Sequence, residues 1–178
     1  MPAEDFLETA TRECARLKKL ADDALAQMPA EGYFARAADV DNSIGIIVKH
    51  VGGNLRSRWT DFLTTDGEKP DRNRDGEFEL GEGETRETIL ATWEAGWAGL
   101  LGSLPALGPG DLERTVTIRG EPFSVQQAIT RSLSHTAYHV GQIVFLAKHF
   151  TGEEWKSLSI PLRKSDAFNA APKKYLGT

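Results

Sequence analysis

The chain has 178 residues, 40% of them hydrophobic and 26% charged, which is typical of one globular domain with a buried core, here expected to span residues 1–178. The net charge of −5, without a stripe of Lys and Arg, argues against a nucleic-acid partner. Because no apolar run reaches the roughly 20 residues of a membrane span and the N-terminus lacks a signal-peptide pattern, we expect a cytoplasmic protein without a membrane partner.

The first predicted helix covers residues 3–28. Apolar side chains recur there at helical spacing, and Pro29 ends the pattern. The apolar stripe includes Cys14, which is the only cysteine of the chain. We therefore expect a buried, unreactive thiol and no internal disulfide.

A second helix is predicted over residues 42–64, after a loop at 29–41. Any of the three polar residues at 41–43 could cap its first turn. Gly52 and Gly53 stand in the middle of this helix and weaken it by roughly 1 kcal/mol each relative to alanine. Such a cost indicates close approach by another backbone or a local bend.

Two further helices are predicted, over residues 85–104 and 124–150. Ser124, followed three residues later by Gln127, forms a capping-box pattern at the start of the last helix. Between the two helices, residues 114–123 alternate apolar and polar side chains, which indicates a short hairpin.

Four amphipathic segments joined by two long connections indicate an all-α fold. We expect a four-helix bundle of the up-down-down-up type, with the short hairpin preceding the fourth helix. The tail, residues 151–178, would pack on this bundle or extend from it, and residues 152–158 could form a short helix.

Two histidines lie four residues apart on the fourth helix. Positions i and i+4 differ by about 40° in azimuth, so His135 and His139 point the same way and can share one metal ion. Gln142 lies on the same face. This spacing is weak on its own, because two core histidines can share a helix face by chance.

His50 is the third candidate ligand. It interrupts a largely inward-facing apolar stripe of the second helix, and a buried imidazole needs partners for both nitrogens. A metal would satisfy one nitrogen and a hydrogen-bond acceptor the other. His149 lies ten residues beyond His139, about 15 Å along the helix, and is too far away to join them. We favour a three-histidine site over unrelated core histidines.

The polar connection at residues 65–83 carries candidate substrate-binding residues. Its length is typical of functional loops, and Arg72 and Arg74 could hold a carboxylate or phosphate under a lid. The alternative is a solvated loop whose charges pair among themselves. On the fourth helix, Gln142 could assist the site, and Tyr138 either reaches it or, as we favour, packs between helices.

The same connection also satisfies a calcium-loop pattern at residues 71–82, with ligands at Asp71, Asn73, Asp75 and Glu82. The expected flanking helices are missing from the sequence pattern. Two arginines would also place positive charge in a site for a dication. Calcium binding is therefore disfavoured.

The layout of residues 3–150 resembles the DinB/YfiT-like superfamily of four-helix bundles. The resemblance lies in the histidine pair followed by "VGQI" at 140–143, together with one histidine on the second helix. Three stretches, "HVGGNLRSRWTDFL", "DRNRDGEFE" and "SLSIPLRKSDAFN", resemble a narrower bacterial branch. The resemblance implies a divalent metal on His50, His135 and His139, and a homodimer. Some of its members move a low-molecular-weight thiol, such as bacillithiol or mycothiol, onto or off a substrate.

Three classes of function are consistent with these patterns. The first is a metal-dependent enzyme acting on a small molecule such as a thiol adduct, either a thiol transferase or a hydrolase. The second is a metal-binding module without turnover, and the third is a metal-free helical interaction protein. Position 136 is Thr136, so the HExxH motif of metalloproteases is absent. Among metals, zinc or nickel is favoured, with iron and manganese as alternatives.

Overall fold

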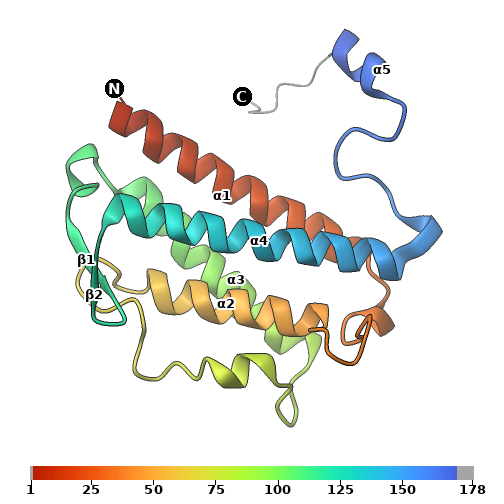
Figure 1. Ribbon diagram of the computed structural model, residues 1–178, viewed down its shortest axis with the longest axis horizontal. Helices are drawn as coiled ribbons and strands as arrows, with labels where there is room; N and C mark the ends of the chain where they lie inside the picture. Colours follow the sequence, from red (N-terminus) through yellow and green to blue (C-terminus); the bar gives the residue numbers. More distant parts are fainter. Residues whose placement is uncertain (1, 172–178) are drawn as a thin grey trace.

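The computed structural model describes residues 2–171, and these residues are mostly helical (Figure 1). Helices α1 and α4 run in one direction, and α2 and α3 run in the opposite direction. No helix among residues 2–171 combines the length and the apolar character needed to cross a membrane. The all-helical class and the small hairpin are confirmed. The elements are α1 (Pro2–Gln27), α2 (Ile44–Trp59), α3 (Arg86–Ser103), β1 (Thr115–Ile118), β2 (Glu121–Ser124), α4 (Val125–Thr151) and α5 (Ser165–Ala170), with short 3-10 turns between them.

Side-chain caps fix where α2 and α4 begin. Of the three candidates before α2, Ser43 is the cap, and its Oγ accepts a hydrogen bond from Ile46 N at 3.4 Å. At α4, Gln127 N donates to Ser124 Oγ at 3.1 Å, and Ser124 N donates to Gln127 Oε1 at 2.8 Å, as the capping box predicts. The caps set the start of both helices that carry the candidate histidines.

The end of α2 and the tail differ from expectation. The helix ends at Trp59 instead of residue 64, because Thr60 is extended and Asp61 takes a positive φ of 46°. Phe62 still reaches the core, since this turn lays its ring 4.8 Å from that of Trp59. In the tail, only Gly152–Glu154 of the expected short helix forms a 3-10 turn, and α5 was not expected. Residues 172–178 lie outside the described part.

The core is built mainly where α2 packs on α3 and α1 packs on α4. A Cβ atom on Gly52 would lie 2.8 Å from Trp93 N and 2.9 Å from its Cα, so only glycine allows this approach of α2 and α3. The expected close backbone contact is thus found. Cys14 is 2% exposed, and burial raises the pKa of its thiol to about 12, in agreement with an unreactive cysteine.

The connection after α2 is anchored to the β1–β2 hairpin. The Asp66 carboxylate accepts hydrogen bonds from Arg119 N and Gly120 N, both at 2.8 Å, and Gly67 N donates to Thr117 O at 2.7 Å. The next residues then run along α2 and form a 3-10 turn at Asp75–Phe78. This path places an otherwise irregular segment beside the middle of α2.

Candidate metal centre

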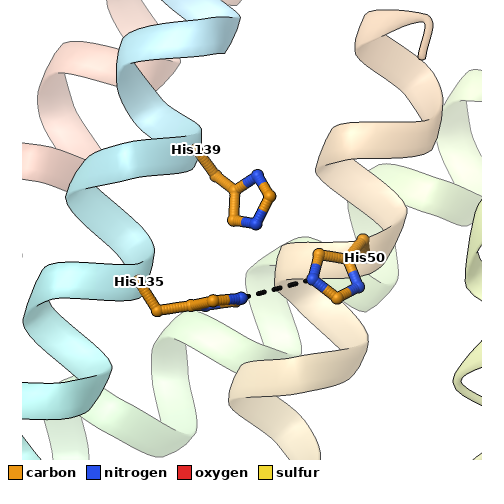
Figure 2. A group of neighbouring side chains, drawn as sticks. All are labelled: His50, His135 and His139. Atoms are coloured by element: carbon orange, nitrogen blue, oxygen red, sulfur yellow. Dashed lines mark hydrogen bonds between the residues drawn. The ribbon is translucent and has the colours of Figure 1, made fainter. Parts of the chain in front are cut away.

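Three imidazoles meet between α2 and α4 (Figure 2). One nitrogen each of His50, His135 and His139 lies within 4.8 Å of the other two. Their ring centroids are 4.6 to 5.3 Å apart. Among residues 2–171, this is the one group of three or more His, Cys, Asp or Glu side chains close enough to hold an ion. The expected convergence of the three histidines is therefore found, and His149 is not part of it. We call this group the histidine triad.

The spacing within the triad suits a small divalent ion. His50 Nε2 and His135 Nε2 are 3.3 Å apart. Two nitrogens bound to one tetrahedral zinc at roughly 2.0–2.1 Å would be about 3.3–3.4 Å apart. The set as a whole extends to 4.8 Å, so an ion would draw at least one ring inward by side-chain rotation.

A buried carboxylate orients His50. Glu77 is 7% exposed, and its Oε2 accepts a hydrogen bond from His50 Nδ1 at 2.8 Å. Burial alone would raise the pKa of Glu77, but the hydrogen bonds from His50 and Arg72 lower it. A charged carboxylate can only accept, so His50 carries a proton on Nδ1, and its Nε2 faces Nε2 of His135 at 3.3 Å.

The sequence did not indicate Glu77 as a residue of the site. The need for an acceptor behind His50 was foreseen, but the acceptor lies 27 residues away in an irregular segment. One signal was present in Gly53, the neighbour of Gly52. A Cβ atom on Gly53 would lie 2.9 Å from Glu77 Cδ, so this glycine leaves room for the carboxylate.

The other two histidines are kept neutral by their surroundings. Gln142 Oε1 accepts a hydrogen bond from His139 Nδ1 at 2.7 Å, which leaves His139 Nε2 free. Burial, followed by the neighbouring His139 and His50, lowers the pKa of His135 to about 4, and burial also lowers that of His139. Neutral imidazoles are the form that binds metals. His135 Nδ1 is buried and has no hydrogen-bond partner within residues 2–171.

Arg72 is held by carboxylates of the protein. Its side chain is 5% exposed, and its Nε and Nη2 donate to Glu77 at 2.8 Å each. Its Nη1 also donates to Glu68 at 3.1 Å. Arg72 thus fixes the carboxylate that fixes His50, and little of its guanidinium is left for a substrate.

Arg74 and Tyr138 are both exposed near the triad. The Arg74 guanidinium lies 5.1 Å from the ring of Phe78, which is itself 4.6 Å from the His50 ring. Tyr138 is 64% exposed, with its ring 4.8 Å from that of His139. The favoured expectation that Tyr138 packs between helices is therefore wrong, because its position on α4 faces outward beside the site.

A cavity of about 580 Å³ opens beside the triad. His50 and His135 form part of its wall, together with residues of the hairpin, α2 and α4. Phe62, Val116 and Ile118 supply apolar surface. This volume is in the range of small-molecule sites, so the triad faces a space that can admit a substrate.

Over residues 2–164, the chain matches the family described as "Protein of unknown function (DUF1572)". The chain belongs to this family. The match includes the whole histidine triad and Glu77. Comparison with curated proteins and with solved structures found no match.

The family match also spans residues 71–82, where the calcium-loop pattern lies. The side chains of the calcium-loop pattern do not converge on a common point. Asp75 is 96% exposed at its side chain and pairs with Arg74 at 3.3 Å, while Asn73 Oδ1 accepts a hydrogen bond from Gly76 N. Within the described residues, the carboxylates of the pattern form no group that could hold an ion.

Proposed function

We propose that the protein is a divalent-metal-dependent enzyme that acts on a small molecule through His50, His135 and His139. The observation that carries this proposal is the convergence of three imidazoles, with a buried carboxylate behind His50 and a cavity beside the triad. Zinc or nickel is the favoured ion, with iron or manganese as alternatives. We also propose that the four long helices form an up-down-down-up bundle of the DinB type, which the directions of the helices support.

The residues of the chain have distinct roles in this proposal. The three Nε2 atoms would hold the ion, and Glu77 and Gln142 would keep the protons of His50 and His139 on Nδ1. A divalent ion at this position supplies a Lewis acid that lowers the pKa of a bound water or thiol. The cavity would admit and orient the substrate beside it.

Among the described residues, neither the cysteine nor the buried carboxylate is available as a nucleophile at the site. The single thiol of the chain, Cys14, is buried on α1 with its pKa raised to about 12. Glu77 is occupied by His50 and Arg72. We propose that the nucleophile comes from outside, as water in a hydrolase or as a low-molecular-weight thiol in a transferase. A thiol substrate would place the protein in the reducing cytoplasm, and the DinB resemblance supports a homodimer.

Metal analysis tests the metal site directly. The protein is produced without a histidine tag, and its metal content is measured by mass spectrometry for the wild type and for single alanine variants. We expect one ion per chain in the wild type and in His149→Ala, a matched control on α4 outside the triad. His50→Ala and His135→Ala should lose most of the ion. Equal metal content in all four proteins would refute the site.

Turnover is tested separately from metal binding. The metal-loaded protein is assayed against small thiols paired with electrophiles, and against thiol adducts and esters for hydrolysis. Activity that disappears in His50→Ala and persists in His149→Ala would support an enzyme. A protein that binds one ion but turns over none of these compounds would be a metal-binding module.

A further inference from the structure

The cavity beside the triad is lined by positive charge. Among the described residues that form its wall, five are arginines and none is Asp or Glu. The chain as a whole, by contrast, carries a net charge of −5. A concave surface with one sign of charge concentrates its electric field and attracts ions of the opposite sign. The arginines are Arg58, Arg72, Arg74, Arg119 and Arg131.

Three of these arginines share a single carboxylate. The Glu68 carboxylate is shared by Arg58 at 2.8 Å, Arg72 at 3.1 Å and Arg119 at 3.2 Å. Glu77 adds a second carboxylate to Arg72. Three guanidinium groups thus face two carboxylates, so the wall of the cavity keeps an excess of positive charge.

Arg131 and Arg74 have the most unused binding capacity. Arg131 has no carboxylate within 4 Å among residues 2–171, and its one recorded contact is with the Phe123 ring, 5.8 Å away. Among the described residues, Arg74 pairs with one carboxylate, that of Asp75 at 3.3 Å. The Asp75 side chain is almost fully exposed, so this ion pair is weak. Both arginines are exposed and form part of the cavity wall, so their side chains can donate to an incoming anion.

We propose that the substrate of the site is a small amphiphilic anion whose carboxylate or phosphate is bound by Arg131. This inference rests on the proposed function, which it extends by naming the substrate class. Arg74 and Arg119 complete the positive mouth, and the apolar body of the substrate lies against Val116 and Ile118. A guanidinium offers a planar fork of donors that matches carboxylate and phosphate oxygens.

The position of Arg131 on α4 links the anion to the triad. Arg131 precedes His135 by one helical turn, a rise of about 6 Å, so both side chains lie on the same face of the helix. Both also contribute to the wall of the same cavity. A head group on Arg131 thus leaves the rest of a small molecule within reach of the histidines.

The test uses three probes that have hydrocarbon chains of similar length but different head groups, namely octanoate, octyl phosphate and the neutral octanamide. Their dissociation constants are measured by calorimetry on the full chain, both zinc-loaded and treated with a chelator. We expect at least one acidic probe to bind on the order of tenfold tighter than octanamide in both forms. The tighter acid identifies the head group as carboxylate or phosphate.

Two variants and a control assign the anion to Arg131. Arg131→Gln should weaken the acidic probe by on the order of tenfold, and Arg131→Lys should recover part of that loss. Arg12→Gln removes an exposed arginine of α1 that pairs with Glu8 at 3.4 Å, and should leave binding unchanged. Circular dichroism verifies that each variant is folded.

The remaining outcomes show which of the two proposals, the anion site or the metal-dependent function, is wrong. Equal binding of octanamide and the acids, no binding of any probe, or unchanged affinity in Arg131→Gln would overturn the anion inference. If zinc still binds with one ion per chain, the proposed metal site survives that failure. Acid binding by the metal-free chain without any zinc binding would instead overturn the proposed function and leave the anion site standing.

Discussion

Replacing Glu77 by glutamine should weaken metal binding without removing any metal ligand. The carboxylate accepts three hydrogen bonds of 2.8 Å, one from His50 Nδ1 and two from Arg72. Glutamine keeps the shape of the side chain but loses its charge. Its single carbonyl oxygen cannot serve all three donors, and its amino group would face another N–H group.

The contacts of Glu77 set the expected size of two effects of this substitution, the loss of stability and the loss of metal affinity. Breaking a buried, hydrogen-bonded ion pair costs about 3–5 kcal/mol. Arg72 retains Glu68 at 3.1 Å, so we expect the lower part of that range or less, about 2–3 kcal/mol of unfolding free energy. Loss of the group that orients a metal-bound imidazole weakens metal affinity by about 10–100-fold.

Glu68→Gln is the matched control. This carboxylate also binds Arg72, together with Arg58 and Arg119, but has no recorded contact with a histidine. It should lower stability while leaving metal affinity within about twofold, because it lies outside the hydrogen bonds of the triad. Affinity is measured by competition with a chromophoric chelator, and stability by urea unfolding of the metal-free proteins. If the two variants weaken metal binding equally, Glu77 does not act by orienting His50.

Two further predictions concern the same site. Gly53→Ala should lower metal affinity by about tenfold in the chelator competition, because its Cβ would displace Glu77. Gly102→Ala is the control and should have no effect, because Gly102 has open space around it. Equal metal affinity in the two variants would contradict this prediction. For the metal-free chain, the pKa of His135 is lowered on folding from 6.5 to about 4. The unfolded chain therefore takes up the proton first as the pH falls, and stability should drop by up to about 3 kcal/mol between pH 6.5 and 4. Urea unfolding of His135→Gln should show a smaller drop, and an identical drop would refute the assignment.

Local signals predicted the helices and their starts. The Ser124 and Gln127 pair forms reciprocal hydrogen bonds that depend on four consecutive residues, so it could be identified without the fold. The end of α2 could not. Residues 60–64 continue an apolar pattern that suits a helix, yet the chain leaves the helix so that Phe62 packs on Trp59 and the next segment reaches the hairpin. Tertiary contacts decide that boundary.

The candidate site divides in the same way. His135 and His139 were found from helical spacing, and His50 from its place in an apolar stripe. Glu77 was missed because its position depends on contacts made far along the chain, such as that of Asp66 with the hairpin. Arg131 was also missed, since a single arginine on an amphipathic helix is typical of a solvated face until a cavity is seen beside it.

Stability alone does not explain the charged network between the cavity and the triad. Arg72 joins Glu68 to Glu77, and Glu77 joins Arg72 to His50. Buried ion pairs of this kind often contribute no more than apolar residues of similar volume, because removing charges from water offsets their attraction. Here the buried ion pairs serve to fix the positions of the side chains around the triad. The network holds a proton on Nδ1 of His50, and it fixes the Arg72 guanidinium in the wall of the cavity that the triad shares.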